Sequence, residues 1–148
     1  MASVELVLAT FREFGIVQER VDAILKKSLP AELPAAQFKL LNHLSFTTNK
    51  DETVSDLAKN SHVTLSAMSQ IIKQVKQKGF VTLVSQEQDS RKKTLLITEQ
   101  GHTAHKSALD NIGVDLQNLA NKFSATDLKK LYELSHQFRT VFEDQHSF

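Results

Sequence analysis

The chain has 148 residues, 24% of them charged, and its 18 Lys and Arg against 17 Asp and Glu give a formal net charge of +1. It contains no Cys, which excludes disulfides, thiolate metal sites, a cysteine nucleophile and thiol-based redox sensing. The length fits one domain, and the near-zero charge argues against a nucleic-acid partner unless the charges are unevenly distributed.

The first segment predicts a long helix with apolar residues on more than one side. A helix of this kind packs against two partners, which favours a second subunit, although a central helix of a monomer fits this segment as well. No basic start with an apolar run and no apolar stretch of about 20 residues is present, so we expect a cytoplasmic protein without membrane contact. The apolar stripe at helical spacing is Val4, Val7, Leu8, Phe11, Phe14, Val21 and Leu25.

Pro34 is expected to open a second helix with Phe38, Leu41 and Leu44 facing inward. A polar turn over residues 48–52 follows, and then a short helix that begins after Thr53 and breaks at residues 60–62.

The next helix is expected to start at an N-cap, either Thr64 or Ser66, and to end at Gly79, because glycine tolerates the left-handed cap conformation. Its predicted inward face is Met68, Ile71, Ile72 and Val75.

Two short β-branched and apolar runs, residues 80–84 and 94–98, are separated by the polar stretch 86–91 and predict a β-hairpin. Thr98 can cap a long helix that continues through Gly113, and a capping box at Ser124 and Asp127 precedes the last helix. The predicted fold is mainly α with a small β-hairpin wing: a winged helix-turn-helix with terminal dimerisation helices.

The charge is unevenly distributed along the chain. Residues 59–93 contain seven basic and two acidic side chains, a net charge of +5, whereas residues 1–58 and 94–148 each carry −2. This basic segment coincides with the predicted helix-turn-helix and hairpin, the unit that can enter a DNA groove. Lysines on solvated helix faces also serve solubility, but a one-sided cluster on this motif favours duplex DNA as the partner.

The candidate DNA contacts lie on three parts of this unit. The second helix can read bases in the major groove, the hairpin tip can reach the minor groove with Asp89 holding Arg91 by an ion pair, and the first helix can bond phosphates. The candidates are Thr53, Ser55, Thr64, Ser66, Ser69, Gln70, Lys73, Gln74, Asp89, Arg91, Lys92 and Lys93.

The chain resembles the MarR family of bacterial transcription regulators over nearly its whole length. The resemblance lies in Leu57-Ala58, residues 64–68, Lys78-Gly79-Phe80-Val81, Asp89-x-Arg91 and Leu96-Ile97-Thr98-x-x-Gly101. The chain departs from the family where many members have an acidic residue and Arg, here Thr82 and Leu83, and where Gln70 replaces a frequent Arg.

The resemblance implies a homodimer that binds pseudo-palindromic operators, usually as a repressor released by a small-molecule effector bound near the second helix and the start of the fifth. It divides the chain into an N-terminal dimerisation helix (1–32), a DNA-binding lobe (33–98) and C-terminal dimerisation helices (99–148). The predicted interface residues are Val4, Leu8, Phe11, Leu131, Phe138 and Phe142.

Other functions have weaker support. His102 and His105 are spaced to share a helix face, but no Glu or Cys set accompanies them, so we expect no metal and no cofactor. Phosphate-loop and hydrolase motifs are absent, so an enzyme is not expected. A helical adaptor that uses the same scaffold for protein contacts remains the alternative function.

Overall fold

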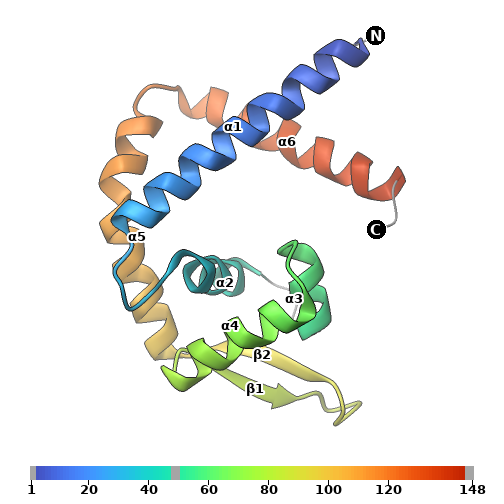
Figure 1. The fold of residues 1–148 in the computed structure, drawn as a ribbon, viewed down its shortest axis with the longest axis vertical. Helices are drawn as coiled ribbons and strands as arrows, with labels where there is room; N and C mark the ends of the chain where they lie inside the picture. The colour runs from blue at the N-terminus through green and yellow to red at the C-terminus, as the bar shows by residue number, and fades with distance from the viewer. Residues whose placement is uncertain (1–2, 48–50, 146–148) are drawn as a thin grey trace. The chain divides into compact units, whose positions relative to one another are not determined.

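The computed structural model describes residues 3–47 and 51–145, and these contain six helices and one hairpin (Figure 1). They form two compact units, one up to Ile112 and one from Gly113 onward, and each is described by itself. The elements are α1 (Val4–Ser28), α2 (Ala35–Phe46), α3 (Val54–Asn60), α4 (Leu65–Gln77), β1 (Val81–Ser85), β2 (Lys93–Ile97), α5 (Glu99–Ala120) and α6 (Ala125–Gln145).

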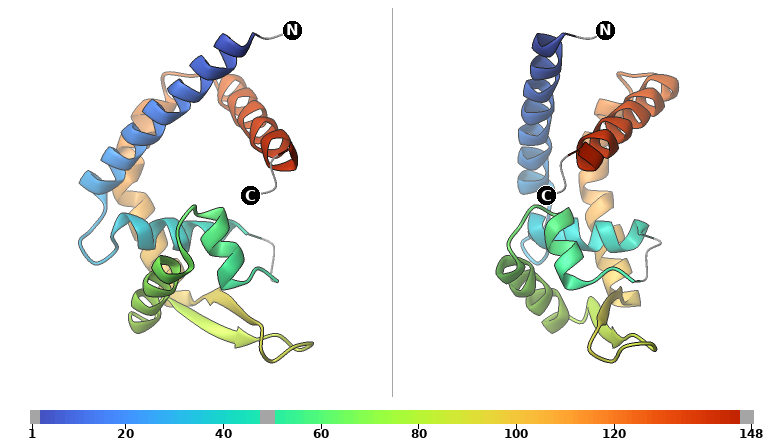
Figure 2. Two further views of the ribbon diagram at one scale, coloured as in Figure 1. Left: turned by 45° about the vertical axis from the view of Figure 1, so that its right-hand side comes forward. Right: turned by 90° about the vertical axis from the view of Figure 1, so that its right-hand side faces the viewer.

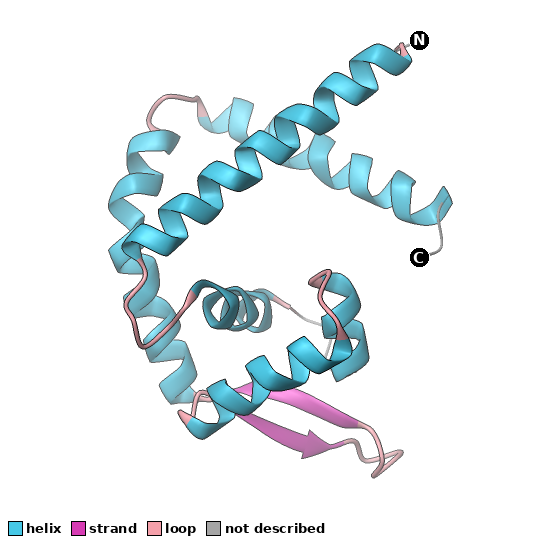
Figure 3. Ribbon diagram, in the orientation of Figure 1, coloured by secondary structure: helices cyan, strands magenta, loops and turns pink. Residues whose placement is uncertain are grey.

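The N-terminal unit is a winged helix, which confirms the predicted fold class. Helix α4 packs on α2, α3 and β1, and β2 packs on α2 and α3. Two further views agree that the hairpin extends away from these helices (Figure 2). Colouring by secondary structure shows this hairpin as the only β-structure in the described part of the chain (Figure 3).

The core of this unit is built from the predicted inward faces. On α4, Met68, Ile72 and Val75 are buried and Ile71 is partly buried, as the helical spacing predicts. They join side chains from every other element of the unit: Leu25, Leu33, Phe38, Leu40, Leu41, Leu57, Ala58, Val81, Leu95, Ala108 and Ile112.

Short polar side chains fix the helix starts. Thr53 and Asp56 form a reciprocal capping box on α3, and Thr64 is the N-cap of α4, where its hydroxyl accepts the Ala67 amide at 3.0 Å. Pro34 lies one position earlier than expected: it is the N-cap of α2 with an extended ψ of 159°, and the helix begins at Ala35.

The turn between α3 and α4 contains an uncommon backbone conformation, since His62 has a φ of 53°. The expected polar turn over residues 48–52 is only partly described, because residues 48–50 lie outside the described residues. Glu52, at its end, is 7% exposed, and its carboxylate takes hydrogen bonds from His43 of α2 (2.6 Å) and Asn60 of α3 (2.7 Å).

The hairpin is antiparallel, with Val81 paired to Ile97 and Ser85 to Lys93. Its strands are shifted by one residue from the predicted ranges, 81–85 and 93–97 instead of 80–84 and 94–98. The shift arises because the Phe80 amide still bonds back to the Val75 carbonyl (3.0 Å) and so completes the end of α4 instead of starting the strand.

A tight junction joins the end of the hairpin to α5. The Thr98 hydroxyl donates to the Gly79 carbonyl (2.6 Å) and accepts the Gly101 amide (3.0 Å), while the Thr98 amide bonds the Phe80 carbonyl (3.0 Å). Gly79 has a φ of +76°, the left-handed cap that the sequence predicts. A methyl group on Gly101 would lie 2.1 Å from the Phe80 carbonyl oxygen, so this close backbone approach requires glycine.

Helix α5 continues through Gly113 without a break, as predicted. In the C-terminal unit, Ser124 caps α6 as predicted, since its hydroxyl accepts the Asp127 amide at 3.0 Å. The Asp127 carboxylate accepts from the Ser124 hydroxyl at 2.7 Å, where a full capping box uses the Ser124 backbone amide. No residue described in α6 is buried, although Leu128, Leu131, Leu134, Val141 and Phe142 line it. No helix in the described ranges is long and apolar enough to cross a membrane.

Candidate nucleic-acid interface

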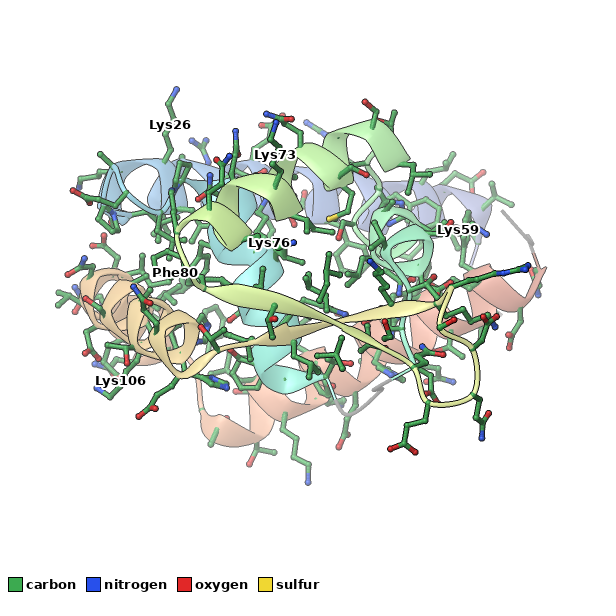
Figure 4. All side chains as sticks on the ribbon, turned by 90° about the horizontal axis from the view of Figure 1, so that it is seen from below. Lys26, Lys59, Lys73, Lys76, Phe80 and Lys106 are labelled. Atoms are coloured by element: carbon green, nitrogen blue, oxygen red, sulfur yellow. The ribbon has the colours of Figure 1, made fainter. Side chains whose placement is uncertain are left out.

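The outer face of α4 carries the polar set expected of a recognition helix. Ser66, Ser69, Gln70 and Lys73 are all exposed. Figure 4 views the hairpin side of the N-terminal unit, with Lys73 and Lys76 labelled on α4. The face combines a cation with side chains that both donate and accept hydrogen bonds, the chemistry needed for phosphates and base edges.

Gln74 does not belong to this outward face. Its amide oxygen accepts a hydrogen bond from the Gln37 amide nitrogen of α2 at 3.0 Å, and the side chain is half-buried. At 3.6 residues per turn, position 74 lies about a quarter-turn from the centre of the face. Gln74 is therefore on the flank of the helix, not in the row predicted to read bases.

The start of α3 offers fewer free groups than expected. The Thr53 hydroxyl donates to the Asp56 carboxylate (2.8 Å) and accepts the Asp56 amide (3.2 Å), so its hydrogen-bonding capacity serves the cap. The Thr53 backbone amide also donates to this carboxylate at 2.9 Å. That bond first, then the Thr53 hydroxyl and the nearby Lys59 and Lys92, hold the pKa of Asp56 below its usual range. Ser55 is exposed beside this cap.

The hairpin tip has the predicted residues but a different internal contact. The Asp89 carboxylate accepts the backbone amide of Arg91 at 3.0 Å, and the Asp89 carbonyl accepts the Lys92 amide at 3.0 Å. The described residues contain no ion pair between Asp89 and Arg91, so the expected role of Asp89 is corrected: it closes the turn through the backbone. Arg91, Lys92 and Lys93 are exposed, with their charges directed to solvent.

Lys78 does not contribute its charge to the basic surface. Its ammonium donates to the carbonyl of Glu32 in the loop before α2 and to the amide oxygen of Gln37 at 2.6 Å. The exposed cations of the basic segment are therefore Lys59, Lys73, Lys76, Arg91, Lys92 and Lys93.

Two apolar side chains beside the recognition helix were not predicted as part of the site. Leu65 at the start of α4 is 55% exposed, and Val63 in the turn before it is also exposed. Apolar side chains at such a position can contact the methyl group of thymine. Helical spacing does not indicate them, because Val63 precedes α4 and Leu65 lies outside its inward stripe.

The two histidines on α5, His102 and His105, lie in different environments. His105 is buried, with ring nitrogens facing the Asn42 amide oxygen (2.9 Å) and the Ser45 hydroxyl (3.3 Å), whereas His102 is exposed. Burial, and to a smaller extent His102, lowers the pKa of His105. The described part of the chain holds no group of three potential metal ligands.

These elements define a winged helix-turn-helix protein whose second motif helix and hairpin tip are both open to solvent. No family model and no curated protein sequence matches the chain. Solved structures do match it, and they have the fold of the MarR family of transcription regulators, as the sequence motifs predict.

Three of these structures span almost the whole chain. The regulator BldR from Sulfolobus solfataricus has a TM-score of 0.74 at 17% identity, covering 93% of this chain and 99% of its own. PcaV from Streptomyces coelicolor, in complex with its natural ligand, has a TM-score of 0.70 at 18% identity, covering 97% and 100%. A variant of MarR from E. coli complexed with operator DNA has a TM-score of 0.68 at 24% identity, covering 93% and 99%.

Proposed function

We propose that this protein is a sequence-specific transcription regulator that binds duplex DNA as a homodimer. The observation that carries the proposal is the open polar face of α4, Ser66, Ser69, Gln70 and Lys73, in the same winged-helix unit as a tip bearing Arg91, Lys92 and Lys93. In this arrangement α4 enters the major groove, and the tip contacts the adjacent minor groove or its phosphates.

Homodimerisation is supported by the apolar surface of the terminal helices. On α1, Val4 is 72% exposed, and Leu6, Leu8 and Val17 are more than half exposed. On α6, Leu131 is 55% exposed within a helix that buries none of its described residues. Apolar surface of this extent marks an interaction site, and a second copy supplies the same helices to cover it. The interface then includes Val4, Leu8, Phe11, Leu131, Phe138 and Phe142.

A two-fold dimer presents two recognition helices about 34 Å apart, one turn of DNA, and therefore reads a pseudo-palindromic operator. We further propose repression with release by a small-molecule effector, supported by the shared fold with a regulator solved with its natural ligand and another solved with operator DNA.

The first test is selection of bound duplexes from a random DNA pool, followed by affinity measurements at several salt concentrations. Each phosphate neutralised contributes about −0.9 to the slope of log K against log salt. The exposed cations set an upper limit of about −5 per winged-helix unit. Enrichment of an inverted repeat with a steep negative slope supports the proposal. Absence of duplex binding at low salt refutes it and leaves the helical adaptor.

Sedimentation of the free protein tests the dimer separately. We expect the mass of two chains, and Leu131→Glu in α6 should shift it toward one chain by placing a charge in the proposed apolar contact. Glu substitution of an exposed polar neighbour, Lys130→Glu, is the matched control and should leave the mass unchanged. A wild-type protein that sediments as a monomer would overturn homodimerisation.

A further inference from the structure

A chain of three side chains connects the loop before α2 to the flank of α4. Lys78 donates to the amide oxygen of Gln37 at 2.6 Å, and the amide nitrogen of Gln37 donates to the amide oxygen of Gln74 at 3.0 Å. Lys78 also donates to the Glu32 carbonyl, and this bond anchors the series of side chains at the loop. Gln37 is only 6% exposed, so its polar groups depend on these partners.

The lysine fixes the direction of every hydrogen bond in this chain. An ammonium group has donors and no acceptor, so Gln37 has to turn its amide oxygen toward Lys78. Its NH2 group then faces Gln74, which has to accept through its own oxygen. The NH2 group of Gln74 is the last donor in this series of hydrogen bonds, and no described residue accepts its hydrogens.

That free NH2 group lies on the flank of α4, a quarter-turn from the outward face. When a helix lies in the major groove, its flanks face the groove walls, which are lined by phosphates. An outward NH2 donates to a phosphate oxygen, whereas an outward amide oxygen would repel it.

We propose that Lys78 and Gln37 are positioning residues that hold the Gln74 amide with its NH2 group outward, as a donor to a DNA phosphate. The inference rests on the proposed DNA binding. It assigns a function to two residues that do not themselves touch DNA, the buried Gln37 and Lys78, whose ammonium bonds Gln37 and the Glu32 carbonyl.

Gln37→Glu tests the donor-to-acceptor direction of these hydrogen bonds, because glutamate has nearly the same side-chain shape as glutamine. The carboxylate still accepts from Lys78 but cannot donate, so Gln74 has to turn its NH2 inward and its oxygen outward. We expect a tenfold or greater loss of affinity for the selected duplex, measured by fluorescence anisotropy at fixed salt. The midpoint of thermal unfolding should be unchanged or raised, because a charged acceptor strengthens the contact with Lys78.

Gln74→Ala provides the control for the charge that Gln37→Glu introduces. If the loss acts through Gln74, adding Gln37→Glu to Gln74→Ala causes no further loss beyond twofold. If it is general repulsion of DNA by the new carboxylate, the loss persists in full in the Gln74→Ala background, and the inference is overturned. Wild-type affinity in Gln37→Glu overturns it as well.

Lys78→Gln is the second variant, used if Gln37→Glu does not fold. A glutamine at this position can donate or accept, so the orientation is no longer imposed, and we expect a smaller loss that also disappears in the Gln74→Ala background. Persistence of that loss contradicts the inference. If the wild-type protein binds no duplex, the proposed function itself is refuted. If the wild-type protein binds the duplex and Gln37→Glu binds it equally well, only the inference about Lys78 and Gln37 is refuted.

Discussion

The junction between β1 and α5 makes a sharp prediction for Gly101→Ala. The new methyl carbon would lie 2.1 Å from the Phe80 carbonyl oxygen and 2.8 Å from Cγ1 of Ile97. The first contact is with backbone, which cannot rotate away as a side chain can. The start of α5 therefore has to move away from Phe80 by more than an ångström, against the hydrogen bonds of Thr98 that hold the two together.

The size of the effect follows from two costs. Overpacking of this kind costs about 1–3 kcal/mol, and losing one of the Thr98 hydrogen bonds costs about 1 kcal/mol more. Alanine recovers up to about 1 kcal/mol of helix propensity. We expect a net loss of about 1–4 kcal/mol in the free energy of unfolding, a large share of the roughly 5–15 kcal/mol typical of a domain.

Gly113→Ala is the matched control, because it makes the same substitution in the same helix. A methyl group on Gly113 has no described atom within 4 Å, so only the helix propensity changes and stability should rise by up to about 1 kcal/mol. Urea unfolding at one fixed protein concentration measures both variants. If Gly101→Ala is as stable as Gly113→Ala, the close approach at Phe80 does not constrain the protein, and the reasoning is refuted.

Three further predictions concern the DNA contacts and one buried histidine. Arg91→Ala should weaken duplex binding about tenfold and reduce the salt slope of the dimer by about two, since each of its two wings loses one cation, while Lys130→Ala leaves both unchanged; equal affinity argues against the wing contact. Gln70→Ala should relax base preference at one operator position by roughly 1–3 kcal/mol, whereas uniform weakening across site variants indicates a backbone contact. Because burial lowers the pKa of His105 below its ordinary 6.5, the unfolded chain binds more protons, so stability should fall as pH drops through 6.5 and level off below the folded-state pKa. His105→Gln should flatten that profile, and an unchanged profile would assign it to other groups.

The helix boundaries could be predicted because their signals are local. Thr53, Thr64, Thr98 and Ser124 all use their hydroxyls to cap the helices that follow them, and each lies within three residues of its partner. The inward face of α4 was predictable for the same reason, since helical spacing alone places Met68, Ile72 and Val75 on one side.

Two of the predictions that needed correction, those for Gln74 and Lys78, depend on residues far apart in the sequence. Gln74 meets Gln37 across 37 residues, and Lys78 meets it across 41, so no local pattern distinguishes them from surface side chains. Counting charges places Lys78 with the DNA-binding lysines, although its hydrogen bonds turn it inward. At Asp89, proximity to Arg91 suggested an ion pair, but the short acidic side chain bonds the nearer backbone amide.

The Thr98 junction has a mechanical consequence. Its hydroxyl and backbone tie the end of α4, the start of β1 and the first turn of α5 into one joint, with no flexible linker between them. We therefore expect the first turn of α5 and the base of the hairpin to move together as one rigid body, because a rotation or shift of that turn alone would break the hydrogen bonds of Thr98.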